Sequence, residues 1–306
     1  MTRPKLRTSA AMVLCCAVTG LALVGCDDSE TDTGSGGDAE SSAPAEDTEA
    51  DAGPFTGTQT ISVGDKSITV SCSGAPVDGR PVVVLLHGGG HDLTTMADFQ
   101  ESLSAEGRVC SYDRLGAGAS DLPDGLQDFE DIGETLTGVL DQIAPDSPVV
   151  LAGHSMGGLI AARYAPDHLD RVHGLVLLDA TPPTQAGDFA ARIPDTVTGE
   201  TAEFRAVTLA TFEGQNPEQL VFADAEVRPA DDIPVRVIQH GHQYLAEMPE
   251  YGPGLEEDWA AGQEKWLALS TDSELSIAEN SAHDIYLDEP EVALAAIENV
   301  IAGAAG

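Results

Sequence analysis

The residues whose types and spacing could do chemistry centre on Ser155, within the segment GHSMGG at 153–158. An apolar run at 149–152 precedes this segment, and a run suited to a helix begins at Leu159. This order predicts a buried strand, a tight turn and a helix, with glycines flanking the serine because larger side chains do not fit such a turn. The turn exposes the serine hydroxyl at the end of the strand. The pattern therefore predicts a nucleophile.

Backbone amides near Ser155 could stabilise the negative charge that forms on an attacked carbonyl oxygen. The amide of Met156 would be the first free N–H group of the following helix. A second donor is expected from the loop HGGG at 87–90, which follows a continuous apolar run at 81–86. Gly89 is the expected donor in this loop, and the adjacent Gly90 is the alternative.

Apolar runs and turn residues predict the elements that must position these groups. Alternating apolar residues over 58–72, interrupted at 64–66, predict a hairpin. Continuous apolar runs predict buried parallel strands, and runs of helical periodicity between them predict crossover helices. The strands are expected at 81–86, 108–112, 149–152, 172–178, 233–238 and 274–278, and the helices at 95–105, 129–143, from 159, at 255–269 and around 292–301. Strands alternating with helices predict a doubly wound α/β sheet.

Two further segments border the predicted site. Residues 180–232 are rich in Pro, Thr, Glu and Asp and carry no continuous strand signal, so we expect irregular structure there. An insertion at the carboxyl edge of a parallel sheet usually covers the pocket, and we interpret this segment as a cap. Asp113 lies in a loop rich in turn residues, ahead of the tight turn at Ser155 in the sequence. We interpret it as an organiser of that loop and not as a catalytic group.

Four motifs in sequence resemble the α/β-hydrolase superfamily over residues 58 to 302. They are VVVLLHGG at 82–89, YDRLGAGAS at 112–120, GHSMGG at 153–158, and Ala282-His283 with Pro290 downstream. The resemblance implies the α/β-hydrolase fold, a mostly parallel doubly wound sheet with a cap insertion. It also implies a serine, a carboxylate and a histidine in this chain order, because an imidazole takes the serine proton and a carboxylate holds the imidazole.

The resemblance assigns the base and the acid to particular positions. His283, in a loop after the last predicted strand, fits as the base. Many relatives carry the acid after the strand predicted at 233–238, but no carboxylate follows that strand before Glu247. The preceding strand does end in a carboxylate, so Asp179 is the expected acid. The carboxylates that stay open as alternatives are Glu247, Glu256, Glu257 and Asp258.

The identity of the nucleophile implies the reaction. Relatives that open epoxides or displace halide carry Asp at this position, whereas Ser155 implies acyl transfer through an acyl-enzyme. We expect a serine hydrolase acting on an ester or related acyl bond of a small molecule, without a cofactor. An acyltransferase, or a surface-tethered binding protein without turnover, is the alternative. No metal site is expected, because His240 and His242 lie in a predicted loop with no Cys or paired Glu nearby.

The first 26 residues resemble a bacterial lipoprotein signal. Three basic residues precede an apolar stretch at 10–24, which is short for a membrane span, and LVGC closes it at Cys26. This implies cleavage before Cys26, a lipid on its thiol and a place on the extracytoplasmic side of the cell membrane. A plain signal peptide or an uncleaved anchor is the alternative. Residues 27–53 carry ten carboxylates and no basic residue, which predicts an acidic disordered tether before the α/β domain at 54–306.

The chain is strongly acidic, with a formal net charge of −38. This charge argues against nucleic acid or an anionic membrane surface as an electrostatic partner. We expect a monomer whose partners are its substrate and the membrane that holds its lipid.

Two cysteines remain when the signal and Cys26 are set aside. An even pair in an exported chain predicts a disulfide between Cys72 and Cys110, with two buried free thiols as the alternative. The segments around both residues are further similar to exported members of the superfamily in which these cysteines pair.

Overall fold

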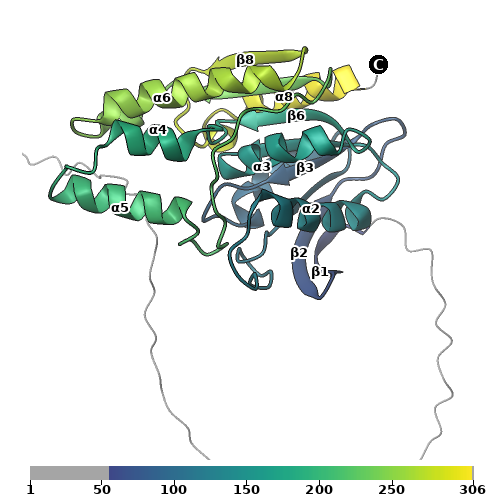
Figure 1. The fold of residues 1–306 in the computed structure, drawn as a ribbon. Helices are drawn as coiled ribbons and strands as arrows, with labels where there is room; N and C mark the ends of the chain where they lie inside the picture. Colours follow the sequence, from purple (N-terminus) through teal and green to yellow (C-terminus); the bar gives the residue numbers. More distant parts are fainter. Residues whose placement is uncertain (1–54, 305–306) are drawn as a thin grey trace, which may run out of the picture. The chain divides into compact units, whose positions relative to one another are not determined.

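An eight-stranded sheet forms the centre of the structure, a computed structural model that describes residues 55–304. The strand order is β1-β2-β4-β3-β5-β6-β7-β8 (Figure 1). β1 and β2 run antiparallel to their neighbours, and the other strands are parallel. The strands are β1 (Gly57–Val63), β2 (Lys66–Ser73), β3 (Val82–Leu86), β4 (Val109–Tyr112), β5 (Val149–His154), β6 (Val172–Leu178), β7 (Val235–His240) and β8 (Ser273–Ala278). The predicted fold class and every predicted strand are confirmed, whereas the predicted signal and tether lie outside the described residues.

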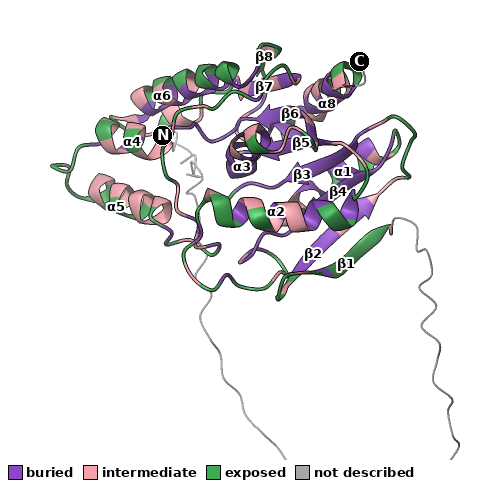
Figure 2. Ribbon diagram, turned by 45° about the vertical axis from the view of Figure 1, so that its right-hand side comes forward, coloured by how far each residue is buried: buried purple, intermediate pink, exposed green. Residues whose placement is uncertain are grey.

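Helices cover both faces of this sheet. Residues alternate along β3, β5 and β6, so that Val84 and Leu151 pack toward one side and Val83 and Val150 toward the other. The first side is covered by α2 (Phe129–Ile143) and α3 (Met156–Tyr164), and the second by α1 (Ala97–Ser104) and α8 (Pro290–Ala304). Figure 2 shows the central strands buried throughout, with solvent-exposed residues on the outer faces of the helices. Burial on two faces explains why these strands read as continuous apolar runs.

A disulfide joins β2 to β4. Cys72 and Cys110 are directly opposite in the antiparallel register, with their Cα atoms 4.1 Å apart, and their sulfur atoms are bonded. Both residues are buried. The predicted pairing of these cysteines is confirmed.

The cap segment, residues 180–232, contains two helices, so the expectation of irregular structure is wrong for these stretches. They are α4 (Gln185–Arg192) and α5 (Glu200–Phe212). Phe189 of α4 and Ile193, which directly follows α4, form a small separate core with Leu255 of α6 (Gly252–Lys265). Figure 1 shows α4, α5 and α6 stacked together, apart from α2 and α3. The apolar residues of α4 pack with α6, whereas Leu220 and Ala230 belong to the main core beside the sheet. Because they contribute to two separate cores, the apolar residues of this segment lack a single core-facing pattern.

Shorter helices complete the described chain: α7 (Ile285–Asp288), and the 3-10 helices η1 (Leu93–Met96), η2 (Ala165–Asp167), η3 (Leu245–Glu247) and η4 (Trp266–Leu269). β7 ends two residues later than predicted, at His240. Within residues 55–304, no helix combines the length and the apolar character needed to cross a membrane.

Candidate active site

Ser155 occupies a strained turn between β5 and α3. Its φ angle is 52° and its ψ angle −120°, a backbone conformation that residues other than glycine rarely adopt. The flanking glycines are required by close backbone contacts. A Cβ atom on Gly153 would lie 2.4 Å from the backbone of Gly157, and one on Gly157 would lie 2.2 Å from the carbonyl oxygen of Leu86. The GHSMGG segment therefore has the geometry expected of a nucleophile elbow.

The glycine loop at 87–90 lies against the start of α3. A Cβ atom on Gly89 would meet Met156 Sδ at 3.5 Å and Met156 Cβ at 3.8 Å. Met156 is the first residue of α3, so its amide has no acceptor within the helix. Gly90 has a φ angle of 71°, which suits the turn that follows. The two amides expected to bind an oxyanion are thus on neighbouring residues beside Ser155.

A buried ion pair is hydrogen-bonded to the backbone of the glycine loop. Arg114 donates to the carbonyl oxygens of His87 at 2.8 Å and of Gly88 at 3.1 Å. Its guanidinium also bonds both carboxylate oxygens of Glu218, at 2.6 and 3.0 Å. Both side chains are almost fully buried. Since Glu218 belongs to the cap segment, this pair joins the cap segment to the loop that carries Gly89.

Asp113 has the organising role interpreted from the sequence. Its carboxylate accepts hydrogen bonds from the amide of Leu93 at 2.7 Å and from the amide of Ala119 at 2.9 Å. It thereby fixes the loop after β4 to the start of η1.

Asp179 and His283 are in direct contact. Asp179 follows β6 with a φ angle of 46°, and its Oδ2 atom lies 2.7 Å from His283 Nδ1. This contact places a proton on Nδ1 and leaves the Nε2 lone pair free to accept one. The structure thus brings together the two residues that the sequence assigned as acid and base.

The other carboxylates considered as the acid have different partners. Glu247 is exposed and lies 3.8 Å from His242, and Asp258 pairs with Arg192 at 2.6 Å. Glu257 is exposed at the edge of the same ion pair, 3.9 Å from Arg192. Each of these side chains therefore points to a partner other than His283.

His240 contradicts the sequence expectation of a loop histidine without a paired Glu. It ends β7, and its Nδ1 atom lies 2.8 Å from Asp179 Oδ2 and 2.9 Å from Asp179 Oδ1. Its Nε2 atom lies 2.6 Å from Glu256 Oε1. Sequence reasoning missed this arrangement because the strand was predicted to end at Ile238 and because Glu256 comes from α6, which meets β7 only in the folded chain.

The charges of this group are set by hydrogen bonding that outweighs burial. Burial by itself would raise the pKa of Asp179, but hydrogen bonds from His240 and His283 hold that pKa below its ordinary value. Burial would lower the pKa of His240, whereas its hydrogen bonds to Asp179 and Glu256 raise the pKa to about 9. Trp259 adds a third donor to Asp179, with Nε1 2.9 Å from Oδ1.

Ser155 contacts a residue that sequence reasoning missed. Its Oγ atom lies 3.5 Å from Thr181 Oγ1, and the amide of Thr181 donates to the Ser155 carbonyl oxygen at 3.0 Å. In the part of the chain that the structure describes, no hydrogen bond joins Ser155 Oγ to His283. The hydroxyl of Ser155 is therefore turned toward Thr181.

His154 ties the elbow to the loop that carries His283. It is buried, and burial together with the neighbouring His283 holds its pKa well below the ordinary value, so its ring is neutral. Its Nε2 atom contacts the carbonyl oxygen of His283 at 3.0 Å. Among residues 55–304, one group of side chains has the composition of a metal site: His91, His154 and Asp284 each place a potential ligand atom within 4.8 Å of the other two. The Nε2 contact of His154 links the turn at Ser155 to the segment that carries His283.

Known proteins share this fold and parts of this sequence. The enol-lactonase from Burkholderia xenovorans LB400 superposes with a TM-score of 0.57 at 20% identity, covering 80% of this chain and 100% of that one. A thermophilic esterase from Thermogutta terrifontis gives a TM-score of 0.56 at 22% identity, covering 81% and 99%. Protein phosphatase methylesterase 1 from Bos taurus is 32% identical over 108 residues, which make up 32% of this chain and 28% of that protein.

The matched stretch spans less than a third of the length of such curated relatives. The model of the alpha/beta hydrolase family, in contrast, matches residues 83–297, which include every residue of the candidate site. With the elbow, the glycine loop and the Asp179–His283 contact in place, the chain belongs to the alpha/beta hydrolase family.

Proposed function

We propose that this hydrolase cleaves ester bonds of small molecules through an acyl-enzyme on Ser155. The observation that carries the proposal is the contact between Asp179 and His283 Nδ1 at 2.7 Å, next to a serine on a strained elbow. Esterases and a lactonase among the structural neighbours support the same class of reaction. Water is the acyl acceptor in this proposal.

The proposed reaction begins when His283 Nε2 takes the proton of Ser155 and Oγ attacks the carbonyl carbon of the ester. The amides of Met156 and Gly89 would bind the resulting oxyanion. The protonated His283 then donates to the leaving alcohol, and water repeats the sequence on the acyl-enzyme. For the first step Ser155 Oγ must turn from Thr181 toward His283, because the two catalytic groups are not engaged in the structure.

A Ser155→Ala substitution tests the nucleophile. Hydrolysis of p-nitrophenyl esters of graded chain length should fall by about 10³-fold or more, because only oxyanion binding and substrate binding remain. A fluorophosphonate probe should label the natural protein at Ser155 and leave the variant unlabelled. Labelling at another residue, or unchanged turnover in the variant, would refute the proposal. Ester turnover that requires an added alcohol or amine would favour an acyltransferase instead.

We further propose that the chain is held at the outer surface of the cell membrane by a lipid on Cys26. The basic start, the short apolar stretch and LVGC in the first 26 residues support this, as does the acidic run at 27–53. Cys26→Ala should block processing or release the protein from membranes, measured by fractionation and by metabolic labelling with a palmitate analogue. A variant that fractionates with membranes as the natural chain does would count against the anchor.

A further inference from the structure

Two histidines share the carboxylate of Asp179. His283 contacts Oδ2 at 2.7 Å, and His240 contacts the same carboxylate at 2.8 and 2.9 Å. Asp179 and His240 are buried, whereas His283 is 26% exposed. Only His283 is therefore accessible to a substrate, and His240 contacts Asp179 on its buried side.

The contacts of His240 determine its proton count. Each of its ring nitrogens faces a carboxylate oxygen, Asp179 on the Nδ1 side and Glu256 at 2.6 Å on the Nε2 side. A carboxylate only accepts hydrogen bonds, so both nitrogens must carry hydrogen. The ring is then an imidazolium between two anions.

Among residues 55–304, the charged groups that act on His240 are Asp179 and Glu256, and its other neighbours are neutral. Trp259, like Glu256, comes from α6 and donates a neutral N–H group to Asp179. The ring of Tyr244 lies 4.9 Å from that of His240, and burial raises the pKa of its phenol well above the ordinary value, which keeps it neutral. The charges facing His240 are thus those of Asp179 and Glu256, and His283 lies on the far side of Asp179.

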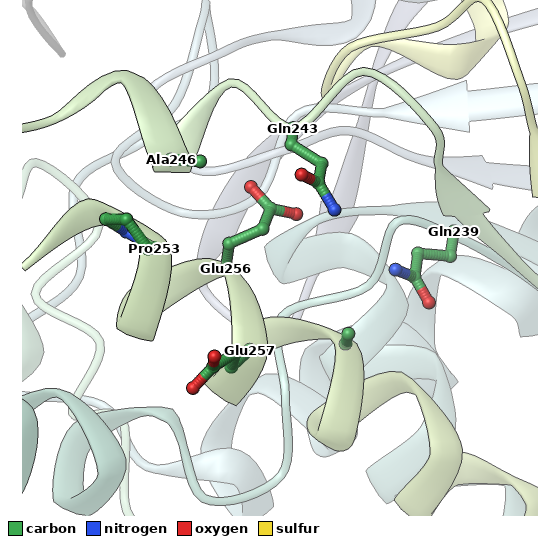
Figure 3. Close-up of a pocket in the computed structure, with 7 residues that line it drawn as sticks. Gln239, Gln243, Ala246, Pro253, Glu256 and Glu257 are labelled. Carbon is green, nitrogen blue, oxygen red and sulfur yellow. The ribbon is translucent and has the colours of Figure 1, made fainter.

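Glu256 also lines a hollow of about 290 Å³ together with Gln239, Gln243 and Glu257, and Figure 3 shows its carboxylate between α6 and the segment that carries Gln243. Its Oε2 atom is buried and has no hydrogen-bond partner among the described residues. The hydrogen bond to His240 is thus made by Oε1.

From this geometry we propose that His240, kept protonated by Glu256, is a positioning residue for the acid of the active site. It fixes the rotamer of the Asp179 carboxylate so that Oδ2 faces His283, and it offsets part of the buried negative charge. The proposal rests on the proposed function, because a role in positioning matters only if Asp179 and His283 act on Ser155.

The proposal predicts the pH dependence of catalysis. The pKa of His240 is raised to about 9, so the ring keeps its proton at neutral pH and loses it as the pH rises through about 9. One carboxylate then loses its hydrogen bond, and kcat should fall on this alkaline limb.

The test uses the full chain in detergent and two variants with matched controls. His240→Asn retains an N–H donor near the position of Nδ1 but cannot carry a charge or reach Glu256. Glu256→Gln retains an acceptor for Nε2 and removes the negative charge. His242→Asn and Glu257→Gln make the same changes at exposed neighbouring side chains. Circular dichroism establishes that each variant is folded.

Ester turnover against pH gives the kinetic readout. His240→Asn should lower kcat roughly 10- to 100-fold with little change in KM, the range found when a partner that orients a functional ligand is removed. Its alkaline limb should disappear. Glu256→Gln should shift the midpoint of the alkaline limb to a pH lower by about 1 unit or more, because an opposite charge beside the imidazolium is lost. The two control variants should match the natural protein.

A second readout is independent of turnover. Nitrogen-15 NMR of histidine-labelled natural protein should show both ring nitrogens of His240 protonated at pH 7. In Glu256→Gln the midpoint at which one of these nitrogens loses its proton should fall by about 1 pH unit or more, as the kinetic limb does. A neutral His240 in the natural protein would overturn the proposal, as would a His240→Asn profile equal to that of His242→Asn. If the natural protein lacks ester turnover, the proposed function fails, and the NMR result alone decides the charge of His240.

Discussion

Ser155 and Asp179 are alike in their backbones. Their φ angles are 52° and 46°, and they follow neighbouring parallel strands, β5 and β6, at the same edge of the sheet. Left-handed conformations of this kind are costly for residues other than glycine, and they cluster at functional sites where the surrounding structure enforces them. From these positions Asp179 contacts His283 and Ser155 contacts Thr181.

Asp179→Asn tests the acid at this scale. The amide can present an N–H group to His283 Nδ1, which stabilises the wrong imidazole tautomer and removes the charge that supports the imidazolium. Turnover should fall by up to about 10⁴-fold, as in serine proteases with this change. The steady-state rate constants and the melting curve should be measured together.

Asp188→Asn is a suitable control, because Asp188 lies on α4 and pairs with Lys265. If Asp179→Asn melts near the natural protein and keeps its activity, the acid must lie elsewhere.

Sequence reasoning anticipated the contact between Asp179 and His283, because both residues follow predicted parallel strands. Asp179 comes directly after the strand predicted at 172–178, and His283 lies in the loop after the strand predicted at 274–278, so both were expected at the same edge of the sheet. His240 and Thr181 were missed for opposite reasons. The end of β7 was placed two residues early, which turned His240 into a loop residue. Thr181 carries no sequence signal, because its contact with Ser155 depends on how the chain leaves β6.

At the scale of elements, the ion pair between Arg114 and Glu218 connects the cap segment to the glycine loop. Glu218 and Arg114 are 104 residues apart in the sequence and nearly fully buried. No pattern in the sequence relates them, although Arg114 belongs to one of the four family motifs. The pair was therefore not predictable, whereas β4, which ends two residues before Arg114, was.

Glu218→Gln should weaken both stability and catalysis. Removing one charge of a buried pair leaves the guanidinium uncompensated, which costs roughly 3 to 5 kcal/mol in comparable cases. The glycine loop loses its support, so kcat should fall more than KM rises. Urea unfolding and ester kinetics measure the two effects.

Glu213→Gln, an exposed change in the same segment, serves as the control for Glu218→Gln. Identical stability of Glu213→Gln and Glu218→Gln would show that the ion pair contributes nothing.

The disulfide joins the antiparallel edge to the parallel part of the sheet. Replacing Cys72 and Cys110 together by Ala should lower the free energy of unfolding by about 2 to 4 kcal/mol, because the unfolded chain loses a covalent constraint. Urea denaturation of the oxidised protein, with a reduced sample as control, measures this. An unchanged midpoint in the double variant would mean that the sheet register alone holds these strands.

At the scale of the whole molecule, fold class was the most predictable property. The central strands β3, β5 and β6 are buried on both faces and leave continuous apolar runs, and each of these runs was recognised. The cap was predictable in position but not in structure, since the partner of α4 is α6 and the two are separated by about sixty residues of chain. Of the sequence ahead of residue 55, only the pattern of charges and small residues carries the argument for a tether.

Helix α6 contributes to two structures at once. Leu255 belongs to the core beneath α4, and Arg192 of α4 pairs with Asp258 on the same helix. Glu256 and Trp259, on the next faces of α6, contact His240 and Asp179. If a substrate displaced α4 and α6 together, the groups bonded to His240 would move with them. Thermodynamic reciprocity would then require the proton on His240 to affect that displacement, and binding under the cap would depend on pH.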